Sequence, residues 1–320
     1  MKTTPFFFLL LITQFSTFAQ LKEFEGTIVY QVGVKSKVEG VSDNTWRNGL
    51  ALGDNLTTII RQGNYKQTTG PTEIYTIAKD KKTYLKFQGI DTLYYLDYAS
   101  DTSAVLNVQK SEDKKNIAGF DCRSITIKTH SATRNYYYAP TLYLNPEYSK
   151  DNTIEQYNVF AEKTSSVYLS TEEEKESYKT SLTAISVKQE PVNEKIFELP
   201  ALPQKIFTDD AIIKRPKFAR AGGLSKYIEL YIKGDLGAKY IKIPKGEESA
   251  IQTAIVVFMI NEEGRTVKAH VINKDDVHPK LAEEAIRVIS TAPTWIPGTV
   301  LGKPIITWFK QPITFMASRH

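Results

Sequence analysis

The last third of the chain has a distinctive order of hydrophobic and polar positions. Residues 251–260 form an apolar run (IQTAIVVFMI), a polar turn ends in Gly264, and residues 265–272 (RTVKAHVI) then alternate between polar and apolar. Two such runs joined by a short turn that ends in glycine predict a β-hairpin. The alternation predicts that one face of the second strand is buried and the other is exposed to water.

A helix is predicted after this hairpin. Pro279 suits the first turn of a helix, where its missing N–H costs nothing, and Pro293 ends the pattern. Between them, four apolar residues fall on one stripe of the helix: Leu281, Ala285, Val288 and Ile289. The run PIITWFKQPITF then returns as a third strand. The order predicts a small ββαβ unit, in which one helix covers one face of a short antiparallel sheet.

These segments together resemble the C-terminal domain of TonB and its relatives. The resemblance covers roughly the last third of the chain and includes Gly222 and Gly223, which open a predicted helix before the hairpin. It is carried, in this order, by the strings VVFMINEEGRTVKAHVI, HPKLAEEAIRVI, PTWIPG, GKPIITWF and PITF. In the TonB family, the last strand is the sheet edge that pairs with an extended segment of an outer-membrane receptor.

The resemblance implies a partner-binding edge strand in this chain. An unpaired strand edge offers N–H and C=O groups to an extended peptide, and Pro312 limits the length of the pairing because it has no N–H. The expected partner is a peptide segment of an envelope protein, such as a TonB-dependent outer-membrane receptor. The implied binding residues are Ile305, Ile306, Thr307, Trp308, Phe309 and Lys310. Trp295 and Trp308 are either peptide anchors or, for Trp295, packing between helix and sheet.

The chain differs from an energy-transducing TonB in two respects. Its N-terminal apolar segment reads as cleavable, and it has no Pro-rich spacer long enough to cross the periplasm. These differences leave a recognition module without the parts that couple TonB to an inner-membrane proton channel.

The region before this module is a series of short strand candidates. They are bounded by Gly, Asp, Asn or Lys, and helix signals are sparse, which predicts a curled and mainly antiparallel sheet. Two prolines in RNYYYAPTLYLNPEY favour an extended excursion or an edge segment there, and argue against a central strand. Four strings resemble the GLPGLI-type exported proteins: FEGTIVYQV, KKNIAGFDCRSITI, YYYAPTLYLNP and TAISVKQEPVNEKIFELP.

The GLPGLI resemblance implies a fold similar to that of the lipoprotein carrier LolA, an incomplete barrel around an apolar cavity. The GLPGLI string itself is absent from this chain. The implied sheet either holds an apolar or lipid ligand or has a filled core. With the C-terminal module, the overall prediction is an α+β protein.

The N-terminal residues predict export. Lys2, the apolar run PFFFLLLIT and the small residue Ala19 form a signal peptide, with cleavage before Gln20. We therefore expect a periplasmic protein of a diderm bacterium that can associate peripherally with the envelope. The predicted organisation is a signal peptide (1–19), a β-rich domain (20–202), a linker (203–221) and a TonB-like domain (222–320).

Composition and motifs favour binding over catalysis. The net charge of +5 is spread along the chain, and no nucleic-acid-binding motif accompanies it. The single Cys122 cannot form an internal disulfide, and the four histidines lack metal-ligand spacing. No nucleophile or phosphate-loop motif is present. We therefore predict no enzyme activity, cofactor or metal. The main hypothesis is peptide binding by the edge strand, and the alternative is a carrier of an apolar or lipid ligand.

Overall fold

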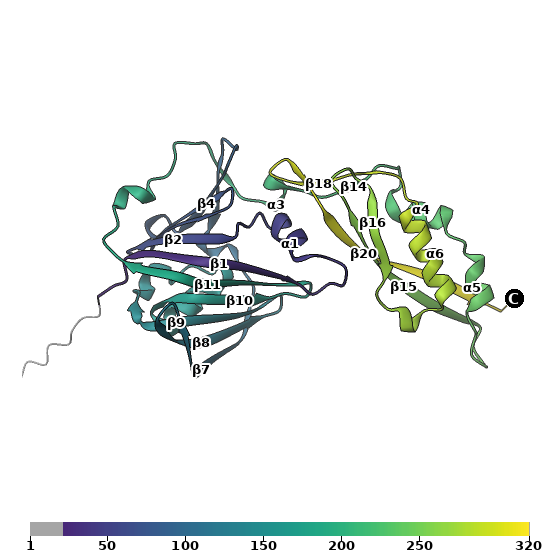
Figure 1. The fold of residues 1–320 in the computed structure, drawn as a ribbon, viewed down its shortest axis with the longest axis horizontal. Helices are drawn as coiled ribbons and strands as arrows, with labels where there is room; N and C mark the ends of the chain where they lie inside the picture. Colours follow the sequence, from purple (N-terminus) through teal and green to yellow (C-terminus); the bar gives the residue numbers. More distant parts are fainter. Residues whose placement is uncertain (1–21, 320) are drawn as a thin grey trace, which may run out of the picture.

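A computed structural model describes residues 22–319, so the predicted signal peptide lies outside the described residues. The fold is mainly β and has a large curled sheet and a small sheet flanked by helices (Figure 1). None of the described helices has the length and apolar character needed to cross a membrane.

The large sheet has twelve strands, and the predicted curled antiparallel sheet is confirmed. Its order is β12-β6-β5-β4-β3-β2-β1-β11-β10-β9-β8-β7, and only the β12–β6 pair is parallel. The strands are β1 (Gly26–Ser36), β2 (Asn55–Arg61), β3 (Asn64–Thr69), β4 (Thr72–Ile77), β5 (Lys82–Phe87), β6 (Leu93–Asp97), β7 (Val105–Ile117), β8 (Phe120–Thr129), β9 (Thr133–Tyr143), β10 (Ser166–Glu174), β11 (Tyr178–Gln189) and β12 (Gln204–Ile206).

The first strand holds the two halves of this sheet together. β1 pairs with β2 on one side and with β11 on the other, so the start and the end of the N-terminal region meet. Its alternating pattern buries Ile28, Tyr30 and Val32 on one face. Gly26 is required at its start, because a Cβ there would lie 1.9 Å from the carbonyl oxygen of Lys188.

The expected edge position of the segment around Pro140 is wrong. β9 lies inside the sheet, between β8 and β10. The proline is accommodated because pairing with β8 stops at Tyr138, and the β10 register shifts on the way to Tyr143. Pro140 therefore needs no ladder hydrogen bond, although its strand is internal.

Short helical segments connect and cover the large sheet. Ser42 caps helix α1 by accepting a hydrogen bond from the N–H of Thr45. Phe160 of helix α2 is fully buried against β8 and β9. These segments are α1 (Asp43–Gly49), η1 (Ala78–Asp80), η2 (Tyr98–Ser100), η3 (Pro146–Ser149), η4 (Ile154–Gln156), α2 (Tyr157–Thr164) and η5 (Glu194–Phe197).

The C-terminal part is a three-stranded sheet in the order β16-β15-β20, with α6 packed on one face. Its core contains Val256, Phe258, Val288 and Ile289. The TonB-like identity of this part stays a prediction. The main elements are α4 (Gly223–Tyr231), α5 (Asp235–Tyr240), β15 (Ser249–Ile260), β16 (Thr266–Val271), η6 (Lys274–Asp276), α6 (Pro279–Ser290) and β20 (Thr307–Ser318).

The segment predicted as a linker carries short structural elements. β12 extends the large sheet, whereas the later strands pair with short strands near β20. These small elements are α3 (Asp209–Ile212), β13 (Ile213–Lys214), β14 (Lys217–Phe218), β17 (Trp295–Ile296), β18 (Gly298–Val300) and β19 (Lys303–Ile305). The chain therefore passes from the large sheet to the C-terminal part within residues 207–213, between β12 and β13.

The two parts also touch through side chains, on the face of the small sheet that α6 leaves open. Val41 of the N-terminal part packs with Val257 and Met259 of β15. The Trp46 ring of α1 lies 5.4 Å from the Trp308 ring, edge to face. We name this set of residues the interdomain contact.

We predict that the two parts fold independently, and limited trypsin digestion tests this. Lys214 is exposed and lies just beyond the change of partner, so cleavage there should give two protease-resistant fragments. The fragments should co-elute in gel filtration, because the interdomain contact and the β13–β18 pairing both survive the cut. A single resistant core, or joint digestion of both parts, would contradict the prediction.

Candidate functional site

A cavity of about 340 Å³ lies against β1, β9, β10 and β11 of the large sheet. The loop after α1 and the junction of η4 with α2 complete its wall. Its volume falls in the range of small-molecule sites, about 300–1,000 Å³. The apolar and aromatic lining residues are Val32, Leu50, Leu52, Tyr136, Tyr157, Tyr168, Tyr178 and Leu182.

The tyrosine hydroxyls around this cavity are held by hydrogen bonds. The Tyr65 and Tyr157 hydroxyl oxygens lie 2.8 Å apart, and the Tyr136 hydroxyl donates to the carbonyl oxygen of Glu155 at 3.0 Å. The Tyr30 hydroxyl donates to the Tyr168 carbonyl at 2.8 Å. Burial raises the pKa of Tyr157 to about 12, so its hydroxyl stays protonated at neutral pH. Tyr136 and Tyr157 therefore line the cavity as rings whose hydroxyls are held in position.

A charged network borders the aromatic wall. The Arg134 guanidinium donates to Glu173 Oε1 at 2.5 Å and to Gln156 Oε1 at 2.6 Å, and both charged side chains are less than one-fifth exposed. Lys175 Nζ lies 3.6 Å from the same Glu173 oxygen. Both cations that line the cavity are thus engaged by one carboxylate.

Glu155 is the exception in this network. Within residues 22–319, no hydrogen bond or ion pair within 4.0 Å reaches its carboxylate. Glu155 is exposed by surface area, but much protein stands around its carboxylate at the cavity, and this partial loss of hydration raises the pKa of Glu155. The positive charge of Arg134 opposes the rise without cancelling it.

The backbone that presents this carboxylate is strained. Glu155 and Gln156 have φ of 54° and 56°, so two consecutive non-glycine residues adopt the left-handed conformation. Each costs on the order of 1–3 kcal/mol and persists only where the surroundings enforce it. Here the Gln156 side chain is fixed by Arg134 and by Asp101, whose Oδ2 lies 2.8 Å from Gln156 Nε2. Strain of this kind is typical of functional sites.

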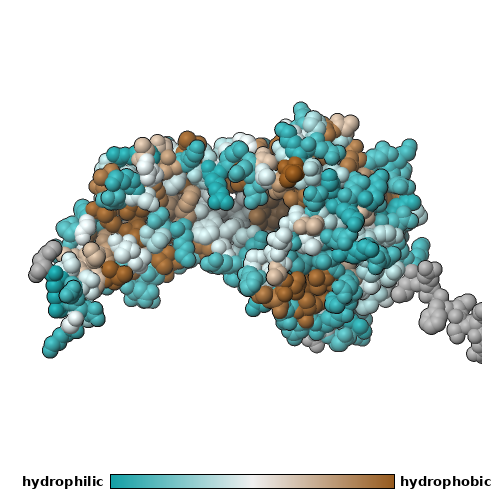
Figure 2. Space-filling model, turned by 180° about the vertical axis from the view of Figure 1, so that it is seen from behind, coloured by the Kyte–Doolittle hydropathy of each residue, from teal (hydrophilic) through white to brown (hydrophobic). Residues whose placement is uncertain are grey.

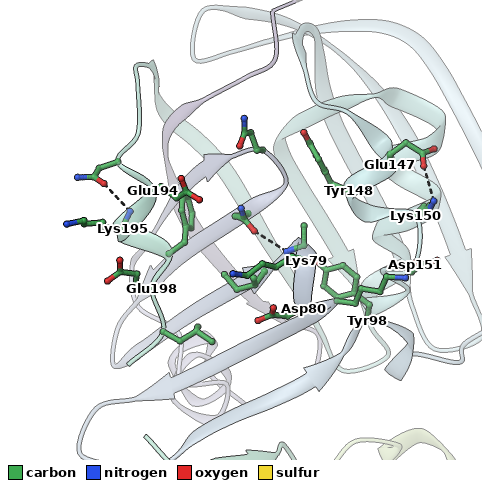
Figure 3. Close-up of a pocket in the computed structure, with 18 residues that line it drawn as sticks. Lys79, Asp80, Tyr98, Glu147, Tyr148, Lys150, Asp151, Glu194, Lys195 and Glu198 are labelled. Atoms are coloured by element: carbon green, nitrogen blue, oxygen red, sulfur yellow. Dashed lines mark hydrogen bonds and ion pairs between the residues drawn. The ribbon is translucent and has the colours of Figure 1, made fainter. Parts of the chain in front are cut away.

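A larger cleft of about 1,090 Å³ lies elsewhere on the large sheet and is the weaker candidate. Figure 3 shows Glu194, Lys195 and Glu198 on one side, facing the η3 segment on the other. Two ion pairs lie in its lining: Lys81 Nζ is 2.6 Å from Asp151, and Lys150 is 3.0 Å from Glu147. Ion pairs this exposed contribute little. Glu194, Lys195 and Glu198 of the lining are also exposed, so this cleft resembles a solvated charged surface.

The predicted edge strand is divided between two elements. Ile305 ends β19 and pairs with Gly298, and Ile306 packs in the interdomain contact. Residues 307–310 lie in β20, which stands at the edge of the small sheet and pairs with residues 257–260 of β15.

Only some residues of β20 direct their backbone N–H and C=O groups away from β15, toward the open edge of the sheet. Ile255 directs its N–H to Asn273 and accepts at its carbonyl from Ile272, so its backbone polar groups face β16. Its partner Pro312 therefore faces away from β15. By alternation, the backbones of Trp308 and Lys310 also point outward, whereas those of Thr307 and Phe309 bond to β15.

The tryptophans pack inside the protein. Trp295 is 6% exposed, and its ring lies 4.9 Å from Phe218 and 5.1 Å from Phe309. It joins helix and sheet, as the packing interpretation expects. The Trp308 ring contacts Trp46 in the interdomain contact, so its backbone faces the edge while its side chain is covered from one side.

Sequence reasoning did not find the network around Glu155. Its members come from three distant segments, and the string NTIEQYN matches no motif. The enrichment in tyrosine was the only visible signal, and it indicated strands but no cavity. Among the described residues, no group of three or more His, Cys, Asp or Glu could hold a metal ion.

No protein-family model and no curated protein matches the chain. Among solved structures, it is similar to PNGF-II in the P21 space group, with a TM-score of 0.33 and 10% identity over 92% of this chain and 65% of that chain, less than two thirds of its length. The Mycobacterium tuberculosis lipoprotein LppX is similar with a TM-score of 0.26 and 13% sequence identity, over 53% of this chain and 89% of LppX. LprF from Mycobacterium bovis is similar with a TM-score of 0.24 and 9% sequence identity, over 53% of this chain and 88% of LprF. At these scores the similarities establish neither fold nor function.

We predict that Glu155→Gln stabilises the protein at high pH only. The pKa of Glu155 is higher in the folded state than in the unfolded state, so the folded state binds the proton of this carboxyl more tightly. The folded state therefore loses stability as the pH rises from the unfolded-state pKa through the folded-state pKa. The variant should melt slightly above wild type at pH 8 and at the same temperature at pH 4, and the difference should be small because water screens the exposed carboxylate. Thermal unfolding followed by circular dichroism measures this difference.

The control for this experiment is Glu176→Gln, because Glu176 is exposed and lines neither cavity. Its melting temperature should follow that of the wild type at both pH values. Equal melting of Glu155→Gln and wild type at pH 8 would show that the carboxylate is not isolated in the folded protein.

Proposed function

We propose that this chain is a non-catalytic binding protein of the cell envelope, and that its large sheet holds a small ligand in the cavity around Tyr157. The observation that carries the proposal is the cavity wall, in which apolar and aromatic side chains surround a space of about 340 Å³. Half of the lining residues are apolar or aromatic and half are polar or charged, a composition that suits a ligand with both an apolar body and a polar group. The predicted signal peptide supports the location, and the curled sheet supports the carrier hypothesis.

A cavity-filling variant tests ligand binding. Leu50 lies at the rim and is 37% exposed, so Leu50→Trp should occupy the space without disturbing the core. We predict that wild type binds the fluorescent apolar probe N-phenyl-1-naphthylamine and that Leu50→Trp weakens this binding about tenfold. Leu230→Trp is the matched control, because Leu230 is 58% exposed on α4, away from the cavity. Equal binding by all three proteins would contradict the proposal.

A second candidate function is peptide binding at the outer edge of β20. The outward backbones of Trp308 and Lys310 support it, because they can pair with an added strand. The TonB resemblance suggests an envelope partner of the outer-membrane receptor class. Of the residues implied by that resemblance, these two would supply the backbone hydrogen bonds, and Thr307 and Phe309 would support the strand from inside the sheet.

A proline at position 310 tests this second function. Lys310→Pro removes one outward N–H without breaking the β15 ladder, whereas Lys310→Ala keeps the N–H and removes only the side chain. In crosslinking pull-downs from envelope extracts, we predict about tenfold weaker capture of the partner by Lys310→Pro and little change for Lys310→Ala. Full capture by a folded Lys310→Pro protein would exclude this edge as the binding site.

A further inference from the structure

The charged side chains that line the cavity differ in whether they form ion pairs. Arg134 and Lys175 both contact Glu173, and Glu172 pairs with Lys179 at 2.6 Å. The carboxylates of Glu172 and Glu173 are thus taken up by Arg134, Lys175 and the neighbouring Lys179. Among the lining carboxylates, Glu155 alone forms no hydrogen bond or ion pair within 4.0 Å in the described residues, although the charges of Arg134 and Lys175 act on it from farther away. Glu155 is therefore the lining carboxylate that remains available to pair with a cationic ligand.

The aromatic lining adds to this preference. The negative faces of tyrosine rings attract cations, and the attraction grows where water is excluded. The protein already uses this contact at the cavity, because Lys175 Nζ lies 5.6 Å from the centre of the Tyr178 ring. Tyr136, Tyr157 and Tyr168 line the same space and have no cation of their own among the described residues.

Other features of the molecule carry less. The larger cleft is lined by exposed charged side chains, of which Glu147 and Lys150 pair with each other (Figure 3). Seen from behind, the surface is mainly hydrophilic with separate brown patches, one of them on the part built by the large sheet, and no occupant is indicated for them (Figure 2). The buried Cys122 has a pKa raised to about 11 by burial, which makes its thiol unreactive.

We propose that the cavity binds an organic cation, with an amine or quaternary ammonium group beside Glu155 and an apolar body against the tyrosines and Leu52. This inference rests on the proposed function and specifies its ligand class. The strained backbone at Glu155 and Gln156 then has a purpose, since it holds a carboxylate in the cavity ready to pair with the ligand. An anionic ligand would instead compete with Glu173 for Arg134 and Lys175 and would face Glu155 directly.

Isothermal titration calorimetry of the full mature chain with matched eight-carbon probes tests the ligand class. The probes are octyltrimethylammonium, 1-octanol and octyl sulfate, which share a chain and differ in charge. We expect octyltrimethylammonium to bind at least about tenfold more tightly than the other two. Octylphosphocholine is added to distinguish a lipid headgroup from a simple amine. If it binds more tightly than octyltrimethylammonium, the natural ligand carries a lipid headgroup; if it binds more weakly, the natural ligand is a simple amine or ammonium compound.

Substitution of the carboxylate assigns the effect to Glu155. Glu155→Gln keeps the shape and removes the charge, so it should weaken octyltrimethylammonium binding about tenfold and leave 1-octanol binding unchanged. Glu176→Gln should bind like wild type. Unfolding of the variant would be visible as lost 1-octanol binding, which keeps the two causes apart.

The outcomes separate this inference from the function on which it rests. Equal binding of the cation and 1-octanol, both blocked by Leu50→Trp and neither changed by Glu155→Gln, would overturn the cation inference and leave the cavity as a ligand site. Tightest binding of octyl sulfate would overturn it as well. If no probe binds, the proposed ligand-binding function itself fails.

Discussion

The pairing of β1 with β11 is the constraint on which the rest of the structure depends. It joins the first strand of the large sheet to the last long one, so the meander of β2 to β6 and the meander of β7 to β10 become one curled surface. Gly26 permits the close approach of the two backbones at one end of the pair. Without this contact, the two halves would expose their apolar faces, and the cavity between β1, β9, β10 and β11 would have no wall.

Local sequence patterns predicted those elements whose contacts are close in the chain. The alternation around Ile28 and Tyr30 indicated a half-buried strand, and the many short runs indicated a curled antiparallel sheet, which the structure confirms. The position of β9 was missed because Pro140 argues against an internal strand. That argument fails where a register shift relieves the proline of pairing, and a register shift depends on the neighbouring strands.

The candidate site was beyond sequence reasoning for a related reason. Arg134, Gln156 and Glu173 meet only because β9, η4 and β10 are adjacent in space. The left-handed conformation at Glu155 has no signature either, since glycine or asparagine would be expected there. The isolation of a carboxylate depends on which distant partners fail to reach it, which no local pattern records.

The cavity wall and the edge strand share one chain of aromatic contacts. Tyr178 lines the cavity, and its ring lies 4.4 Å from the ring of Trp46. Trp46 in turn packs against Trp308, whose backbone faces the open edge of β20. Packed rings leave little free space, so displacement of one requires movement of the next. The side chain of α1 that stabilises the contact between the two parts is therefore also the one that supports both candidate binding surfaces.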